Sequence, residues 1–172
     1  MTSSQQQIAT LQRAAHTAVR AGKLRDAHQH CLAILALDQD FADAWFLCGV
    51  IAAHNGQVKK CVEIFHKAIA LAPDNGEYLA ELGKQLIALR ETQQALHVAR
   101  QAYALNPSRA PVLNTLGTVF SHCGEHATAL ICYGRAVRAL KHTTAEAGNP
   151  SASWQADLYF NLGASLQFAG RF

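Results

Sequence analysis

A spacing of 34 residues between similar side chains constrains the fold of this chain more than any other feature. Two series of small residues keep this interval: Gly49, Gly83 and Gly117, and Ala68, Ala102 and Ala136. An internal repeat of this length, with small residues at fixed places, is typical of arrays of helical hairpins. We therefore predict an all-α chain in which each hairpin buries its apolar side chains against its neighbours.

The repeat resembles that of the tetratricopeptide repeat (TPR) family. The fullest match runs through Trp45, Cys48-Gly49, Cys61, Phe65, Ala68 and Pro73, with Cys61 where the family prefers Ala. The resemblance extends over nearly the whole chain. It implies an all-α, right-handed superhelical solenoid of antiparallel helix hairpins, with about four full repeats and the first helix of a fifth.

The spacing divides residues 1–172, which we expect to form a single TPR domain. The repeats are expected at 8–41, 42–75, 76–109 and 110–143, followed by an insert at 144–155 and a partial repeat at 156–172. The insert contains the turn-forming residues 148–151. It is interpreted either as a tolerated loop insertion or as a contact element anchored by Trp154.

The sequence also predicts where turns occur and where helices start. Gly22, Gly56 and Gly124 separate the two helices of their repeats, where glycine tolerates left-handed geometry. Arg90 stands at the equivalent place in the third repeat, so a tighter or more helical turn is expected there. Candidate N-caps and charged first-turn residues are Asp40 or Asp43, Asp74, Thr92 and Ser108. Pro111 is expected in a first helical turn.

Composition limits which cellular compartment and which class of partner can be expected. Net charge is +3, and the basic residues are scattered rather than forming a phosphate track, so no nucleic-acid binding is expected. No run of 18 apolar residues occurs, so no membrane span is expected. The five cysteines form no CxxC pair. Four of them fall at or beside core positions of the repeat, and all are expected to be reduced in a bacterial-type cytoplasmic protein.

The sequence provides no catalytic motif, so the chain alone is not expected to be an enzyme or to bind a cofactor. Two clusters of His and Cys are candidate metal sites. In the first, His28 and His30 are two residues apart and would point to different faces of a helix. In the second, Gly124 would interrupt the helix between His122 and His126. No metal site is therefore expected.

The TPR resemblance implies a groove lined by the first helix of each repeat. By position, the groove residues would be Gln12, His16, Arg20, Phe46, Val50, His54, Lys84, Asn114, Thr118, His122 and Phe160. This mixed polar and aromatic lining suits an extended or helical peptide. The carboxylate clamp of chaperone-binding TPRs is not supported, because Gln12 and His16 occupy its early positions.

The leading interpretation is a scaffold that binds a peptide or protein in this groove. A second interpretation is the N-terminal substrate-recruiting module of a larger transferase whose catalytic domain lies beyond Phe172. Residues 157–172 resemble the late TPR region of bacterial TPR-containing sulfotransferases, and glycosyltransferases are the other candidate. A third interpretation is a homodimer formed through Tyr159, Leu162 and Leu166, because the partial repeat lacks a second helix.

Overall fold

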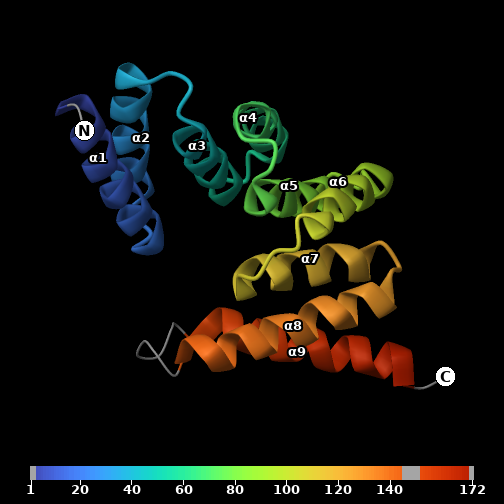
Figure 1. Cartoon of the computed structure of the whole chain (residues 1–172). Coiled ribbons are helices and arrows are strands. Elements are labelled where there is room, and N and C mark those ends of the chain that lie inside the picture. The colour runs from blue at the N-terminus through green and yellow to red at the C-terminus, as the bar shows by residue number, and fades with distance from the viewer. Residues whose placement is uncertain (1–2, 145–151, 171–172) are drawn as a thin grey trace. The chain divides into compact units, whose positions relative to one another are not determined.

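The computed structural model describes residues 3–144 and 152–170, and within them it contains helices and no strands (Figure 1). The predicted all-α TPR fold is confirmed. The helices in chain order are α1 (Ser3–Arg20), α2 (Leu24–Leu37), α3 (Ala42–His54), α4 (Val58–Leu71), α5 (Gly76–Ala88), α6 (Thr92–Ala104), α7 (Ala110–His122), α8 (His126–Thr144) and α9 (Ala152–Gly170).

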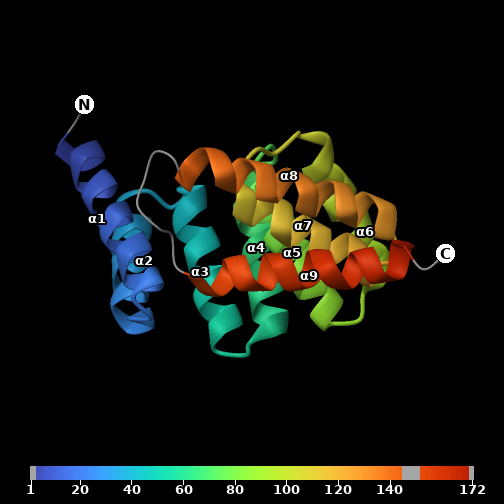
Figure 2. The same ribbon diagram turned by 90° about the horizontal axis from the view of Figure 1, so that it is seen from below.

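The helices fall into two compact units, Met1–Tyr78 and Leu79–Phe172. In the first unit, α1 packs on α2 and α3 packs on α4, while α2 and α1 both contact α3. In the second unit, α7 packs on α8, and α9 lies along α8 and also contacts α7 (Figure 2). These are the hairpin pairs that the 34-residue repeat predicts. The assignment of one domain to residues 1–172 stays a prediction.

Glycine at the repeated position permits two of the hairpins to close tightly. A Cβ atom on Gly49 would lie 2.5 Å from the Phe65 ring, and one on Gly117 would lie 2.5 Å from the Tyr133 ring. Both rings are fully buried. A Cβ on Gly83 would meet nothing closer than 3.4 Å, which is ordinary van der Waals contact. Close approach therefore explains Gly49 and Gly117 but not Gly83.

The turn inside each of the first four hairpins has the same hydrogen bonds. Gly22, Gly56 and Gly124 have φ of 71°, 72° and 81°. Arg90 has φ of 63°, so the expectation of a tighter or more helical turn at this residue is wrong. Its N–H donates to the Ile87 carbonyl, as the Gly56 N–H donates to the Ala53 carbonyl. Arg90 therefore adopts the left-handed conformation that glycine adopts elsewhere.

The helix starts differ from several expected caps. The Asn75 Oδ1 atom accepts hydrogen bonds from the N–H groups of Glu77 and Tyr78, so Asn75 rather than Asp74 caps α5. Phe41, Glu91 and Arg109 occupy the N-cap positions of α3, α6 and α7, without side-chain capping bonds. The N-cap roles expected of Asp40, Thr92 and Ser108 are therefore wrong. Asp43 lies in the first turn of α3, and Pro111 in that of α7, as expected.

The boundaries of the last two helices also differ from the predicted boundaries of the insert. Helix α8 continues to Thr144. Helix α9 already begins at Ala152, so residues 152–155 of the predicted insert belong to this helix. The rest of the insert, 145–151, and the side chain of Trp154 lie outside the described residues. The two interpretations of the insert stay predictions.

Candidate partner-binding faces

A carboxylate in the first unit connects the first helices of three successive hairpins. Asp43 on α3 accepts a hydrogen bond at Oδ2 from Gln12 Nε2 at 2.9 Å, and His16 Nε2 lies 2.8 Å from the same oxygen. The Tyr78 hydroxyl, from α5, donates to Asp43 Oδ1 at 3.5 Å. We call Gln12, His16, Asp43 and Tyr78 the Asp43 cluster.

The Asp43 cluster is only partly covered. The His16 side chain is 36% exposed and that of Asp43 is 19% exposed. Burial raises the pKa of the Tyr78 phenol, and the charge of Asp43 raises this pKa further. Tyr78 therefore keeps its proton at neutral pH and remains a donor to the carboxylate. Because Tyr78 is itself buried, an incoming polar group would meet only the partly exposed side chains of Gln12, His16 and Asp43.

Phe46 does not line an open groove. Its side chain is 6% exposed, and its ring stacks on Tyr78 with centroids 4.4 Å apart and on Phe65 with centroids 5.3 Å apart. The structure therefore corrects the expected role of Phe46: it packs in the core and holds Tyr78 in position. Of the other expected groove residues in this unit, Arg20 and His54 are exposed and Val50 is half-buried.

In the second unit, Thr118 on α7 connects neighbouring helices. Its Oγ1 atom donates to the Asn114 carbonyl at 3.1 Å and lies 3.5 Å from two donors, Asn161 Nδ2 on α9 and the Tyr133 hydroxyl on α8. His122 Nδ1 lies 2.8 Å from the Thr118 carbonyl. Asn114, Thr118 and His122 therefore follow one another along α7 at intervals of four residues.

An unused acceptor lies in this row. Asn114 Oδ1 is buried and has no hydrogen-bond partner among the described residues. Leaving such a group unpaired destabilises a protein by about 1–3 kcal/mol.

Lys84 and Phe160 are two exposed residues among those expected in the groove of this unit. The Lys84 side chain is 55% exposed and its Nζ lies 3.6 Å from Glu81 Oε2. Glu81 Oε1 also accepts a hydrogen bond from Thr115 Oγ1 at 3.2 Å. Phe160 on α9 is 76% exposed. Lys84 thus belongs to a charged pair, and Phe160 presents an uncovered ring.

Sequence reasoning did not identify Tyr78, Glu81 or Thr115 as members of these polar contacts. A signal existed for one contact, because Glu81 and Thr115 are 34 residues apart and so occupy the same repeat position. No comparable signal marks Tyr78, which lies 35 residues from Asp43. Repeat position indicates a face but does not select which side chains on that face meet.

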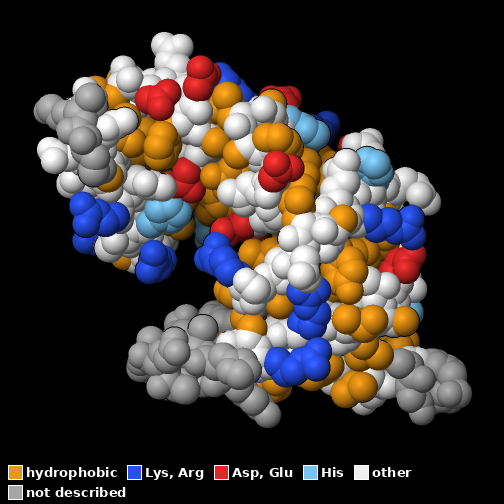
Figure 3. Space-filling view, in the orientation of Figure 1, with side chains coloured by type: hydrophobic (Ala, Val, Ile, Leu, Met, Phe, Trp, Pro, Cys, Tyr) orange, Lys and Arg blue, Asp and Glu red, His pale blue; other side chains and the backbone are white. Residues whose placement is uncertain are grey.

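Neither a cluster of metal-ligating side chains nor a membrane-spanning helix occurs in the part of the chain that the structure describes. Its residues hold no group of three or more His, Cys, Asp or Glu side chains that could bind a metal ion. None of the described helices is both long and apolar enough to cross a membrane. Lys and Arg side chains are spread among acidic and neutral ones on the face seen in Figure 3.

Part of the chain matches a known protein family. Residues 13–76 match the family model described as Tetratricopeptide repeat. FlbA of Caulobacter vibrioides is 24% identical over 70% of this chain and 26% of its own length. The chain therefore spans about a quarter of this curated relative.

Three solved structures share the fold. The match in the APC/C Cut9–Hcn1 hetero-tetramer has a TM-score of 0.77 at 20% identity, covering 94% of this chain and 30% of the other. The O-GlcNAc transferase of Thermobaculum terrenum has a TM-score of 0.68 at 22% identity, covering 78% and 27%. YrrB, a TPR protein with an unusual peptide-binding site, has a TM-score of 0.59 at 20% identity, covering 91% and 74%. The family match thus covers residues 13–76, and the solved structures show that the chain has the fold of TPR proteins.

Proposed function

We propose that this chain is a bacterial-type cytoplasmic scaffold that binds a peptide or protein segment on the exposed faces of its first helices. The observation that carries the proposal is the half-exposed Asp43 cluster, which connects α1, α3 and α5. YrrB, which has a similar fold and an unusual peptide-binding site, supports the same function. The TPR fold is typical of scaffolds without catalytic activity.

Each unit supplies its own part of the binding surface. In the first unit the contacts are Gln12, His16, Arg20, Val50 and His54, on α1 and α3. In the second unit they are Lys84, Asn114, Thr118, His122 and Phe160, on α5, α7 and α9. Fixed hydrogen-bonding side chains favour a ligand whose backbone or side-chain donors match them, because preorganised groups lose less entropy on binding.

The test is selection of binders from a library of random displayed peptides, followed by calorimetric titration of each selected peptide. His16→Ala probes the first unit and Lys84→Glu the second. Each change is expected to weaken the peptides that use its unit by about tenfold, which corresponds to about 1.4 kcal/mol. Lys59→Glu introduces the same change of charge on α4, a second helix, and is expected to leave binding unchanged.

Circular dichroism shows whether each variant keeps its helices. The proposal is wrong if the selected peptides bind both folded variants as tightly as they bind the unmodified chain. It is also wrong if Lys59→Glu weakens the peptides as much as Lys84→Glu does, because a general charge effect would then explain the binding.

A second candidate function is that of a substrate-recruiting module in a larger transferase. It is favoured by the finding that the chain spans 26% of FlbA and 27% of the O-GlcNAc transferase. The mass of the intact native protein tests this candidate. A mass equal to that of residues 1–172 would argue against it, and a larger mass would allow the attached domain to be assayed for transfer.

Self-association is a further proposal for the partner. Helix α9 exposes the large apolar side chains of Tyr159 and Leu166, which are 54% and 53% exposed, while Leu162 beside them is half-buried. We infer that a second copy of the chain covers this face. Peptide binding uses Phe160, which neighbours this face, but self-association and peptide binding otherwise use different residues. One of the two proposals can therefore fail without the other.

A further inference from the structure

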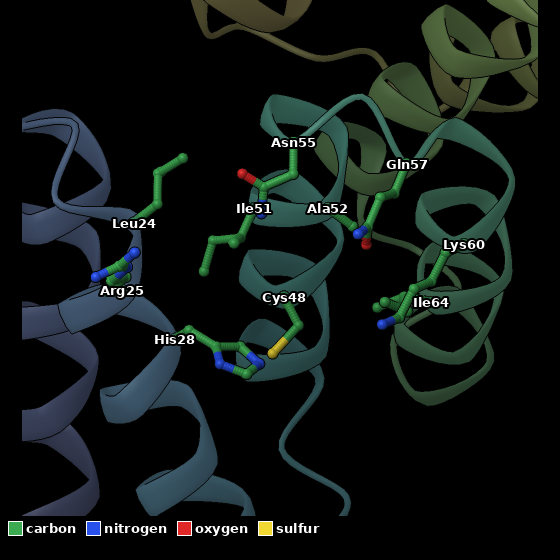
Figure 4. Close-up of a pocket in the computed structure, with 10 residues that line it drawn as sticks. All are labelled: Leu24, Arg25, His28, Cys48, Ile51, Ala52, Asn55, Gln57, Lys60 and Ile64. Atoms are coloured by element: carbon green, nitrogen blue, oxygen red, sulfur yellow. The ribbon is translucent and has the colours of Figure 1, made fainter.

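A pocket of about 320 Å³ lies between α2, α3 and α4 in the first unit, and none of its lining residues belongs to the Asp43 cluster (Figure 4). Leu24, Ile51, Ala52 and Ile64 supply apolar walls, and Arg25, His28 and Lys60 supply basic groups. Asn55 and Gln57 add amides, and no Asp or Glu belongs to the lining. An uneven charge of this kind favours an anionic ligand.

The remaining lining residue is Cys48, whose side chain is 9% exposed. Figure 4 shows its sulfur and the His28 ring turned toward each other from α3 and α2. Cys31 is fully buried, and its thiol interacts with that of Cys48 closely enough to shift the pKa of both. The two cysteines come from adjacent hairpins and are both free thiols.

The contact between the two thiols shifts their pKa values in opposite directions. The interaction with Cys31 lowers the pKa of Cys48 and outweighs burial, which raises it, and the positive charge of Lys60 lowers it further. The same interaction raises the pKa of Cys31, as does burial. Cys48 therefore loses its proton before Cys31, and it is also the thiol that borders the pocket. The thiolate is the form that attacks disulfides.

We propose that Cys48 is a thiol–disulfide exchange site that takes small anionic disulfides through this pocket, with Cys31 as the resolving thiol. Oxidised glutathione represents the ligand class, because its carboxylates would pair with Arg25 and Lys60. The proposal goes beyond peptide binding on the first helices and uses none of the residues assigned to that function.

The chemistry proceeds in two exchanges. The Cys48 thiolate attacks one sulfur of oxidised glutathione, a mixed disulfide forms, and one glutathione leaves as its thiolate. The Cys31 thiol then loses its proton to the departing thiolate or to water and attacks Cys48 Sγ. This step forms the Cys31–Cys48 disulfide and releases the second glutathione. Together the two cysteines lose two electrons and two protons, and oxidised glutathione gains these electrons and protons.

Other thiols provide the internal control. Cys61 and Cys132 are fully buried, and Cys123 in the second unit is partly exposed. Burial raises the pKa of Cys123, and nearby Glu125 raises it further. Cys123 should therefore react slowly, and replacing it by serine leaves Cys48 as the accessible thiol.

The experiment uses the full chain carrying Cys123→Ser and follows intact mass during incubation with oxidised glutathione. The expected product is the Cys31–Cys48 disulfide, located by peptide mapping. Adding Cys31→Ser should stop the reaction at one glutathione on Cys48, and adding Cys48→Ser should prevent the reaction. The neutral reagent hydroxyethyl disulfide should react more slowly than oxidised glutathione.

Charge reversal at the pocket separates recognition from general reactivity. Lys60→Glu should lower the rate with oxidised glutathione, relative to the rate with hydroxyethyl disulfide, by about tenfold. Lys59→Glu, on the same helix but outside the lining, should leave that ratio unchanged. Thermal unfolding checks that every variant is folded.

Three outcomes would overturn the proposal. The first is modification of Cys61 or Cys132 in place of Cys48. The second is a glutathione adduct on Cys48 that persists although Cys31 is present. The third is a ratio of rates that does not distinguish Lys60→Glu from Lys59→Glu.

Discussion

Gly49 and Gly83 occupy the same position of successive repeats, but their surroundings differ. A Cβ on Gly49 would lie within 2.5 Å of two atoms of the Phe65 ring, which is held in the stack with Phe46. At Gly83 the corresponding contacts, to Val98, Ala95 and Val119, begin at 3.4 Å. A glycine with the same place in the repeat can therefore be required by packing in one hairpin and dispensable in the next.

This difference predicts opposite effects for the same substitution. Gly49→Ala should lower the free energy of unfolding by about 1–3 kcal/mol, because the added methyl group overpacks a rigid core. Gly83→Ala should leave it unchanged or raise it by up to about 1 kcal/mol, because alanine favours the helix. Urea unfolding followed by circular dichroism measures both. Equal destabilisation by the two variants would contradict this account.

Arg90 provides a second prediction for a single residue. A residue with a Cβ atom is disfavoured at φ of 63°, and Arg90→Gly should therefore stabilise the chain by about 1 kcal/mol. Gly56→Arg, at the equivalent turn, should destabilise the chain by a similar amount. Thermal unfolding of the two variants gives the comparison. Destabilisation by Arg90→Gly would show that the Arg90 side chain contributes more than its backbone conformation costs.

At the scale of whole elements, α5 starts where its first backbone N–H groups find a side-chain acceptor. Helix α5 begins immediately after Asn75, whose Oδ1 atom serves two N–H groups. This start also places Tyr78 against Asp43 and Phe46, so the cap and the Asp43 cluster share one short segment. Asp74 is also a good capping residue type, but it lies one position too early.

The cap predicts that Asn75→Ala lowers the free energy of unfolding by about 1 kcal/mol. Asp74→Ala is the matched control and should have a smaller effect, since its charge acts only on the helix dipole. Chemical unfolding of both variants measures the difference. If Asp74→Ala were the more damaging change, Asn75 would not be the functional cap of α5.

At the scale of the whole molecule, exposed apolar side chains on α9 bear on the proposed self-association. Tyr159 and Leu166, which are seven residues apart and so lie on the same side of the helix, are each more than half exposed. Burying a large apolar side chain contributes about 1.5–3 kcal/mol, so pairing these residues across two copies is favourable. This argument supports the homodimer proposed above.

The expected result is a molecular mass that rises from that of one chain to that of two as concentration increases, measured by light scattering. Tyr159→Glu combined with Leu166→Glu should keep the chain monomeric, because charged side chains oppose burial. Lys59→Glu together with Lys84→Glu makes an equal number of changes outside α9 and should still dimerise. A monomeric unmodified chain at high micromolar concentration would contradict the proposal.

Much of the fold follows from the sequence because its causes are local. The 34-residue interval fixes which helices pair, and small residues such as Gly49 and Gly117 mark where helices approach closely. Glycine at positions 22, 56 and 124 marks the turns because few other residues adopt positive φ readily. Arg90 is an exception to that rule, because the two helices of its hairpin impose the turn even without glycine.

The sequence by itself thus determined the helical hairpins and their order along the chain. Only the tertiary structure decided that Asp43 connects Gln12, His16 and Tyr78, that Phe46 is buried, and that Cys31 meets Cys48 beside a basic pocket. The physical reason is distance. Periodicity assigns a residue to a face of its helix, whereas a hydrogen bond depends on positioning atoms to within a few tenths of an ångström, which packing between hairpins sets.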